Sequence, residues 1–138
     1  MKIFLDANIM FSASWPGSRT GKFLEVVLNR AEVVTSAYAV EETRRNLAMQ
    51  DPRMLDELRQ LVHLLHLTNK TDVLPDLGLP IKDRPILAAA VAAGCTHLLT
   101  GDFKHFGPLL GRSVHGVKVT SMRMLVDEFI ANGWVTKE

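Results

Sequence analysis

The sequence predicts an α/β fold in which a central, mainly parallel, twisted sheet of four to five strands lies between two layers of helices. Short apolar runs rich in Ile, Val, Leu and Phe indicate buried strands. Amphipathic stretches separate these runs, and strands that alternate with helices form parallel sheets through right-handed crossovers. The chain shows no repeat, low-complexity tract or linker, so residues 1–138 are expected to form a single domain.

The predicted strands are brief and apolar. They comprise residues 2–5, 32–35, 95–100 and 117–120. The run Ile9–Phe11 has the same length and character, and it too is more typical of a strand than of a helix. Residues 68–82 contain Asn, Gly and two prolines, which indicates a loop with a short extended piece at Val73–Leu74.

Helices are predicted from apolar residues at helical spacing and from capping residues at their ends. They cover residues 19–29, 36–49, 51–65, 84–93 and 121–132. Ser36 is a plausible N-cap, and Asp51 precedes Pro52 at the first position of the next helix. Gly94 and Gly133 follow the last turns of two helices, as glycine commonly does.

Composition bounds the class of protein. Hydrophobic residues make up 47% and charged residues 22% of the chain, which is ordinary for a globular domain. Sixteen basic and fifteen acidic residues give a net charge of +1, which neither requires nor excludes a nucleic-acid partner. The lone Cys95 rules out an intramolecular disulfide, and the chain has no signal-peptide pattern and no apolar run long enough to span a membrane. We therefore expect a cytoplasmic protein without membrane contact.

Four acidic positions are predicted to lie at one edge of the sheet. Asp6 and Asp102 directly follow apolar strands, whereas Glu41-Glu42 and Asp83 stand near the starts of helices. In a parallel sheet, strand carboxyl ends and helix N-termini lie at the same edge, where ligands bind. Converging carboxylates repel one another unless a hard cation shares them. The predicted ion is Mg²⁺ or Mn²⁺, because no Cys/His zinc pattern is present, and such an ion suits phosphodiester cleavage.

Each acid also has an ordinary structural interpretation. Asp83 can cap a helix, Asp102 can belong to a turn, and Glu41 and Glu42 can be surface residues near a helix N-terminus. The hypothesis of a metal site therefore depends on the joint arrangement of these residues.

Several segments resemble the PIN-domain ribonucleases, most closely the toxin components of toxin–antitoxin pairs related to VapC-type toxins. The resemblance lies in FLDANIM, TSAYAVEETRRNL, KDRPILAAAVAAGCTHLLTGD and FKHFG, which span nearly the whole chain. It implies a three-layer PIN-like fold and a metal-dependent endoribonuclease that acts on RNA. A cognate antitoxin and a homodimer or higher homo-oligomer are the implied protein partners.

The resemblance also implies roles for individual residues. Catalysis and Mg²⁺ or Mn²⁺ binding are assigned to Asp6, Glu42, Asp83 and Asp102. The family's spacing from a leading Ser or Thr selects Glu42 over Glu41. Asn8 and Thr100 match polar residues that hold carboxylates or water by hydrogen bonds.

Other polar residues are expected to lie outside the metal site. Substrate phosphates are expected to contact Arg44, Arg84 and Lys104, which flank the acids, although each also fits an ordinary solvated surface. His63 and His66 fit an exposed helix surface, and His105 lies close enough to Asp102 to touch substrate but receives no assigned role. The helices near residues 23–28 and 40–65 are expected to supply the surfaces for the partners.

Three other functions compete with the nuclease. The first is a PIN fold that binds RNA or protein, or acts in regulation, without toxic nuclease activity, although the full set of acids argues against it. A phosphoryl-receiving signalling domain would need paired acids early in the chain, where only Asp6 follows the strand. An aspartyl phosphatase would need an acid two residues after Asp6, but this position is Asn8.

Overall fold

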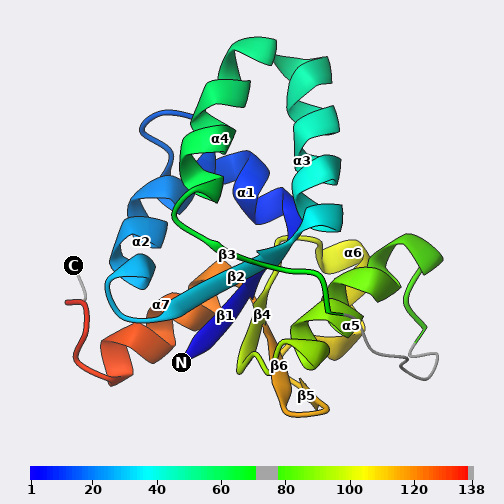
Figure 1. Cartoon of the computed structure of the whole chain (residues 1–138). Coiled ribbons are helices and arrows are strands. Elements are labelled where there is room, and N and C mark those ends of the chain that lie inside the picture. Colours follow the sequence, from blue (N-terminus) through cyan, green and yellow to red (C-terminus); the bar gives the residue numbers. More distant parts are fainter. Residues whose placement is uncertain (71–77, 137–138) are drawn as a thin grey trace.

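The sheet at the centre of the fold has six strands among the described residues, 1–70 and 78–136 of this computed structural model. They are β1 (Lys2–Leu5), β2 (Glu32–Ser36), β3 (His66–Thr68), β4 (His97–Leu99), β5 (Ser113–Val114) and β6 (Val117–Thr120). Their order is β3-β2-β1-β4-β6-β5, and every pair is parallel except β5 with β6 (Figure 1). The predicted fold class is confirmed, with a slightly larger sheet.

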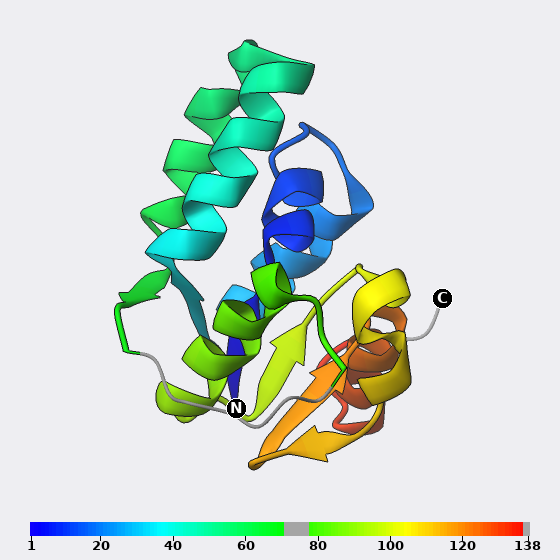
Figure 2. The same cartoon turned by 90° about the vertical axis from the view of Figure 1, so that its right-hand side faces the viewer.

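Helices cover both faces of this sheet (Figures 1 and 2). They are α1 (Ala7–Ala13), α2 (Arg19–Leu28), α3 (Ala37–Gln50), α4 (Leu55–Val62), α5 (Arg84–Ala92), α6 (Phe103–Phe106) and α7 (Met122–Ala131), with 3-10 turns η1 (Pro52–Met54), η2 (Ile81–Asp83) and η3 (Gly107–Leu109). Helices α2 and α7 lie together on one face, and α5 lies on the other (Figure 1). Helices α3 and α4 rise side by side beyond the sheet.

Serine side chains start three of the helices. The Oγ atoms of Ser18, Ser36 and Ser121 each accept a hydrogen bond from the backbone N–H three residues later, at 3.0, 3.2 and 3.2 Å. Each bond satisfies one of the amide groups that a helix leaves without a partner in its first turn. Ser36 thereby sets the start of α3, the helix that carries Glu42.

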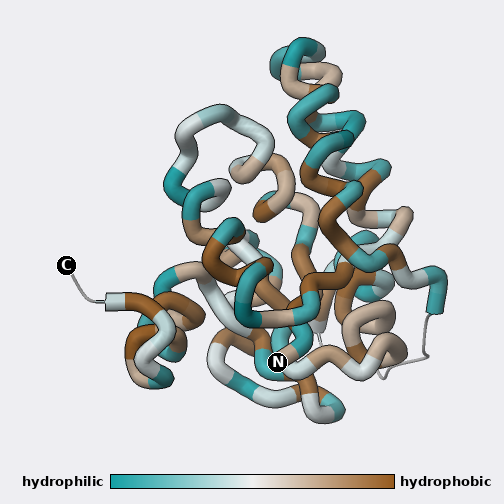
Figure 3. Tube along the Cα trace, turned by 60° about the vertical axis from the view of Figure 1, so that its left-hand side comes forward, coloured by the Kyte–Doolittle hydropathy of each residue, from teal (hydrophilic) through white to brown (hydrophobic). Residues whose placement is uncertain are grey.

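The core lies between the sheet and the two helical layers. Ile3, Phe4 and Leu5 are fully buried, which matches a central strand covered on both faces. On the α2–α7 face, the ring of Phe129 packs edge to face against Phe23 and Trp134, with centroids 5.3 and 5.0 Å apart. Hydrophilic and hydrophobic stretches alternate along α3 and α4, as expected for an amphipathic pair (Figure 3). No helix within the described ranges is both long and apolar enough to cross a membrane.

The structure corrects several element predictions. Ile9–Phe11 is part of α1 and not a strand, because the Asp6 carboxylate caps the first turn and the buried residues Ala7, Ile9 and Met10 follow a helical pattern. The helix predicted over residues 51–65 is shorter in the structure, because α4 ends at Val62 and strand β3 begins at His66. The piece predicted at Val73–Leu74 lies outside the described residues.

A hairpin adds the strand β5, which the sequence pattern did not indicate. Its two-residue turn, His115-Gly116, has positive φ at both positions, 48° and 84°. This conformation matches the twist of hairpin strands, but the usual signal for it is Asn-Gly or Asp-Gly. With only two residues, β5 is also too short to show an alternating pattern.

The chain reverses its direction across the sheet between β1 and β4. From β1 it proceeds outward to β2 and β3, and it then crosses back to β4 on the other side of β1. In open parallel sheets, ligand sites form beyond the carboxyl ends of the strands at such a point. Residues that directly follow β1 and β4 therefore occupy the position where a site is expected.

Candidate metal centre

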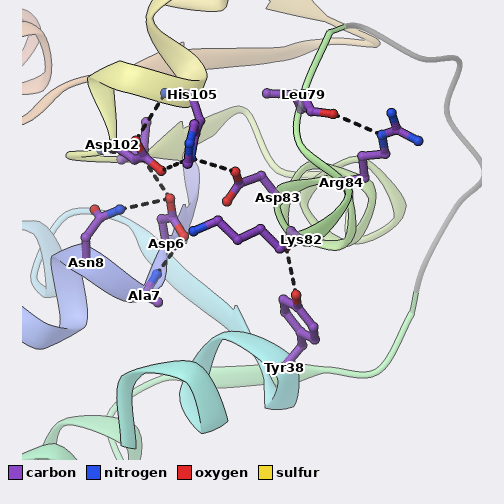
Figure 4. A network of polar contacts seen from close by, with 11 residues as sticks. Asp6, Ala7, Asn8, Tyr38, Leu79, Lys82, Asp83, Arg84, Asp102 and His105 are labelled. Carbon is purple, nitrogen blue, oxygen red and sulfur yellow. Dashed lines mark hydrogen bonds and ion pairs between the residues drawn. The ribbon is translucent and has the colours of Figure 1, made fainter. Parts of the chain in front are cut away.

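Asp6 lies at the end of β1 and begins α1. Because Leu5 pairs with Leu99 in the parallel register, Asp6 stands beside Thr100. The Asp6 carboxylate is only 3% exposed. Its Oδ1 accepts a hydrogen bond from the Ala7 N–H at 2.7 Å, and its Oδ2 accepts bonds from Asn8 Nδ2 at 3.1 Å and Thr100 Oγ1 at 2.8 Å. Backbone and side chains thus hold this carboxylate in one orientation (Figure 4).

The Thr100-Gly101-Asp102 turn follows β4 and connects the two sides of the site. Thr100 Oγ1 accepts a hydrogen bond from the Asp102 N–H at 3.0 Å, and the Gly101 N–H donates to Asn8 Oδ1 at 2.6 Å. A Cβ at Gly101 would stand 3.2 Å from that same Asn8 oxygen, which is tighter than ordinary contact. Glycine is therefore favoured here by the close approach of Asn8.

Asp83 and Asp102 face each other across His105 (Figure 4). His105 Nδ1 is 2.8 Å from Asp102 Oδ2 and 2.9 Å from Asp83 Oδ2. Asp83 is 4% exposed, and despite the short distance to His105 its Oδ2 accepts no hydrogen bond of acceptable geometry. A buried carboxylate oxygen without a donor is uncommon and needs a ligand or a functional explanation.

The two adjacent glutamates of α3 have different surroundings. Glu42 lines a cavity of about 450 Å³ together with Asp6, Asp83 and Asp102. Glu41 is exposed and forms a two-pronged ion pair with Arg44, at 2.8 and 2.6 Å. Successive residues on a helix point about 100° apart, so only one of them can face this cavity.

Burial and mutual repulsion shape the charge state of the acids. The pKa of Asp6 is raised from 3.8 to about 6, mainly by burial and also by the nearby Glu42 charge, which together outweigh the lowering effect of the hydrogen bonds from Thr100, Ala7 and Asn8. Burial also raises the pKa of Asp83, and the Asp102 charge adds to this effect, whereas Lys82 and His105 lower it. The site therefore concentrates negative charge that a bound cation would relieve.

The three basic residues predicted to contact substrate lie in different places. Arg44 is paired with Glu41 and faces a groove between α3 and α4, away from the residues that line the cavity. Arg84 is exposed beside Asp83, and its Nε donates to the Leu79 carbonyl at 3.1 Å. Lys104 is exposed on α6, two residues after Asp102. Their contact with substrate stays a prediction.

The site includes two residues that the sequence pattern did not assign to it. His105 lies one helical turn after Asp102, so the Asp-x-x-His spacing could have indicated their contact. Tyr38 Oη donates to the Lys82 carbonyl at 2.8 Å and so connects the start of α3 with η2. Burial is the largest cause that raises the pKa of Tyr38, and the charges of Glu42 and Asp83 raise it as well. These two charge effects indicate that the Tyr38 hydroxyl lies near both acids.

A family model for the PIN domain matches residues 2–104. The chain belongs to the PIN domain family. The matched range includes Asp6, Glu42, Asp83 and Asp102, and it ends one residue before His105. No curated protein matches the sequence.

The fold of this PIN domain is similar to a chain in the crystal structure of VapBC2 from Rickettsia felis bound to a DNA fragment from their promoter. The TM-score is 0.65, and the match covers 88% of this chain and 98% of that chain. Sequence identity is 13%, so the likeness concerns the fold.

Thr100 offers a test of how the site is held together. Thr100→Val keeps the shape of a fully buried side chain but removes the donor to Asp6 and the acceptor for the Asp102 N–H. We expect Mg²⁺ affinity to fall by about 10–100-fold, as is typical when groups that orient ligands are lost. Calorimetric titration would measure the change. Thr120→Val, at the equally buried end of β6, should leave the affinity within about twofold; equal losses in both variants would contradict the role given to Thr100.

Proposed function

We propose that this PIN domain is a metal-dependent endoribonuclease and the toxin component of a toxin–antitoxin pair. One observation carries the proposal: four carboxylates from separate segments meet at one cavity of about 450 Å³. Beside it, Asp83 Oδ2 is buried and accepts no hydrogen bond of acceptable geometry, although His105 Nδ1 lies 2.9 Å away. Such an arrangement costs stability and is found where a ligand compensates for it.

The residues present fit Mg²⁺ or Mn²⁺. These ions prefer carboxylate oxygens, and the cavity offers Asp6, Glu42, Asp83 and Asp102 as ligands. A divalent ion bound there lowers the pKa of water and stabilises negative charge on a phosphoryl oxygen. This chemistry is what hydrolysis of a phosphodiester bond requires.

Side chains of the protein can hold the Asp6 carboxylate in place, accept a proton from the attacking water and bind a substrate phosphate. Thr100 and Asn8 hold the Asp6 Oδ2 oxygen in place through their hydrogen bonds. Glu42 is less buried than Asp6 and opens onto the cavity, where its carboxylate can orient the attacking water and accept its proton. Lys82 lies close enough to lower the pKa of Asp83 and can bind a substrate phosphate at the same edge.

Exposed aromatic rings beside the acids support an unpaired RNA as substrate. Tyr38 is 42% exposed and Phe103 is 56% exposed, and they come from α3 and α6 on two sides of the site. Aromatic side chains stack on unpaired bases without reading their identity, which suits single strands better than duplexes. Basic residues near the acids, Lys104 and Arg84, can contact the flanking phosphates.

A second surface supports an antitoxin partner. A groove of about 490 Å³ lies between the α1–α2 region and α4, lined by apolar residues such as Trp15, Leu24 and Leu61 and by the charged residues Lys22 and Glu57. It involves both segments, 23–28 and 40–65, that the sequence suggested for partners. The similar fold in VapBC2 also supports this assignment. A homodimer stays a prediction.

The matched pair Glu42→Gln and Glu41→Gln tests the nuclease assignment. With unstructured RNA and Mg²⁺ or Mn²⁺, we expect Glu42→Gln to slow cleavage by about 100-fold or more, because it removes a proton acceptor and a metal ligand. Glu41→Gln should cleave at the wild-type rate, because Glu41 is exposed and paired with Arg44. Gel analysis of end-labelled RNA would measure both rates.

Added EDTA should abolish cleavage by the wild type. Metal-dependent cleavage that persists in Glu42→Gln would show that Glu42 is not part of the active site. If the wild type binds RNA but cleaves none with either metal, the protein is better described as a binding module with a PIN fold.

A further inference from the structure

His105 occupies a position that the four acids alone do not explain. Its imidazole stands between Asp83 and Asp102, with Nδ1 at 2.9 and 2.8 Å from their Oδ2 atoms (Figure 4). Asp102 also caps α6, since its Oδ1 accepts the His105 N–H at 3.1 Å. The same aspartate therefore holds the backbone and the ring of His105 in place.

The three side chains present a compact set of possible ligand atoms. One nitrogen and two carboxylate oxygens lie within 4.8 Å of one another. Asp83 Oδ2 is buried and aimed into this group, where its contact with His105 Nδ1 at 2.9 Å does not have the geometry of a hydrogen bond. Ligands bonded to an ion at about 2.1 Å in an octahedron stand about 3 Å apart. The spacing in this cluster is thus already close to that of a coordination shell.

We propose that His105 Nδ1 is a ligand of the divalent ion at Asp83 and Asp102, and that it shifts the site's preference from Mg²⁺ towards Mn²⁺. This inference rests on the metal site of the proposed function. Mg²⁺ binds oxygen almost exclusively and gains little from an imidazole, whereas Mn²⁺ belongs to the transition-metal series whose affinity rises with nitrogen ligands. A nitrogen in an otherwise carboxylate set therefore favours Mn²⁺.

The competing role for His105 is that of a hydrogen-bond donor. In that case its Nδ1–H would hold the two carboxylates together, and the ion would bind elsewhere in the cavity through oxygen alone. The two roles differ in one observable, which is whether a nitrogen is bonded to the metal.

Pulsed electron paramagnetic resonance of the Mn²⁺-loaded protein detects this bond directly. We expect a ¹⁴N coupling of directly bonded imidazole in the wild type and its loss in His105→Gln. The chain has five histidines, and His63→Gln, an exposed substitution on the end of α4, is the matched control that should keep the coupling. His97 is already held between Thr96 and Glu128, at 2.7 and 3.0 Å, and is not a competing source.

Affinities measured by calorimetry give a second readout that does not depend on activity. The ratio of Mg²⁺ to Mn²⁺ dissociation constants should fall by about tenfold in His105→Gln and stay unchanged in His63→Gln. Mn²⁺ bound without nitrogen coupling, or an unchanged ratio in a folded His105→Gln variant, would overturn this inference but leave the nuclease proposal standing. If neither ion binds the wild type, both proposals fail.

Discussion

Asp6→Asn is expected to reduce RNA cleavage by about 1,000-fold, equivalent to about 4 kcal/mol of transition-state stabilisation. Asp6 is the carboxylate that the fold holds most firmly, through Thr100, Asn8 and the Ala7 N–H. An amide has nearly the same shape but binds Mg²⁺ and Mn²⁺ far more weakly than a carboxylate. Single-turnover cleavage of unstructured RNA, at saturating metal, would measure the loss.

The matched control for this experiment is Asp127→Asn, because Asp127 is an exposed acid on α7. It removes the same charge from the chain, so a general effect of net charge on RNA binding would appear in both variants. Cleavage by Asp6→Asn at more than about a tenth of the wild-type rate would place catalysis away from Asp6.

Without metal, the protein is expected to lose stability as the pH rises from 4 to 8. The folded-state pKa of Asp6 is raised from 3.8 to about 6, mainly by burial, so folding favours the protonated carboxyl. The associated stabilisation is fully present below the unfolded pKa and is lost as the pH rises through about 6. For Asp6 alone this amounts to about 3 kcal/mol, and the raised pKa of Asp83 acts in the same direction.

Urea unfolding in EDTA at several pH values would test this expectation, with Asp6→Asn as the comparison. Other titrating groups contribute equally to both proteins, so the difference in unfolding free energy between them reports on Asp6 alone. The variant should become more stable relative to the wild type as the pH rises. Adding Mg²⁺ at pH 7.5 should stabilise the wild type by mass action and leave Asp6→Asn nearly unchanged. A difference that is constant from pH 4 to 8 would contradict the raised pKa of Asp6.

Both expected results have the same physical origin. The fold places several carboxylates in one partly buried cavity, where the Glu42 charge helps to raise the pKa of Asp6 and the Asp102 charge helps to raise the pKa of Asp83. This repulsion lowers the free energy of unfolding, and under the proposed function a bound cation would relieve it. Variants that neutralise an acid are therefore expected to be more stable without metal and less active with it.

Much of the site could be predicted because its residues follow regular elements. Asp6 and Asp102 come directly after buried strands, and Asp83 precedes the helix that leads into β4. Parallel strands bring their carboxyl ends to one edge, so a correct strand assignment already places these acids near one another. The same local signals located Ser36 as a cap and Gly94 at the end of α5.

Other features had no local signal. The apolar run Ile9–Phe11 has the length of a strand, and only the capping bond from Asp6 shows why a helix begins there. The hairpin strand β5 has two residues and gains its place from pairing with β6. Elements this short take their conformation from their neighbours, so pattern and propensity cannot identify them.

By itself, the sequence determined that acids follow β1 and β4 and that an amphipathic helix carries Glu41 and Glu42, because periodicity and capping are properties of neighbouring residues. Only the tertiary structure decided that Glu42 faces the cavity while Glu41 pairs with Arg44 on the surface. It also decided that His105 stands between Asp83 and Asp102. These choices depend on which helix face and which turn come together across the sheet, and residues distant in sequence meet only when the chain has folded.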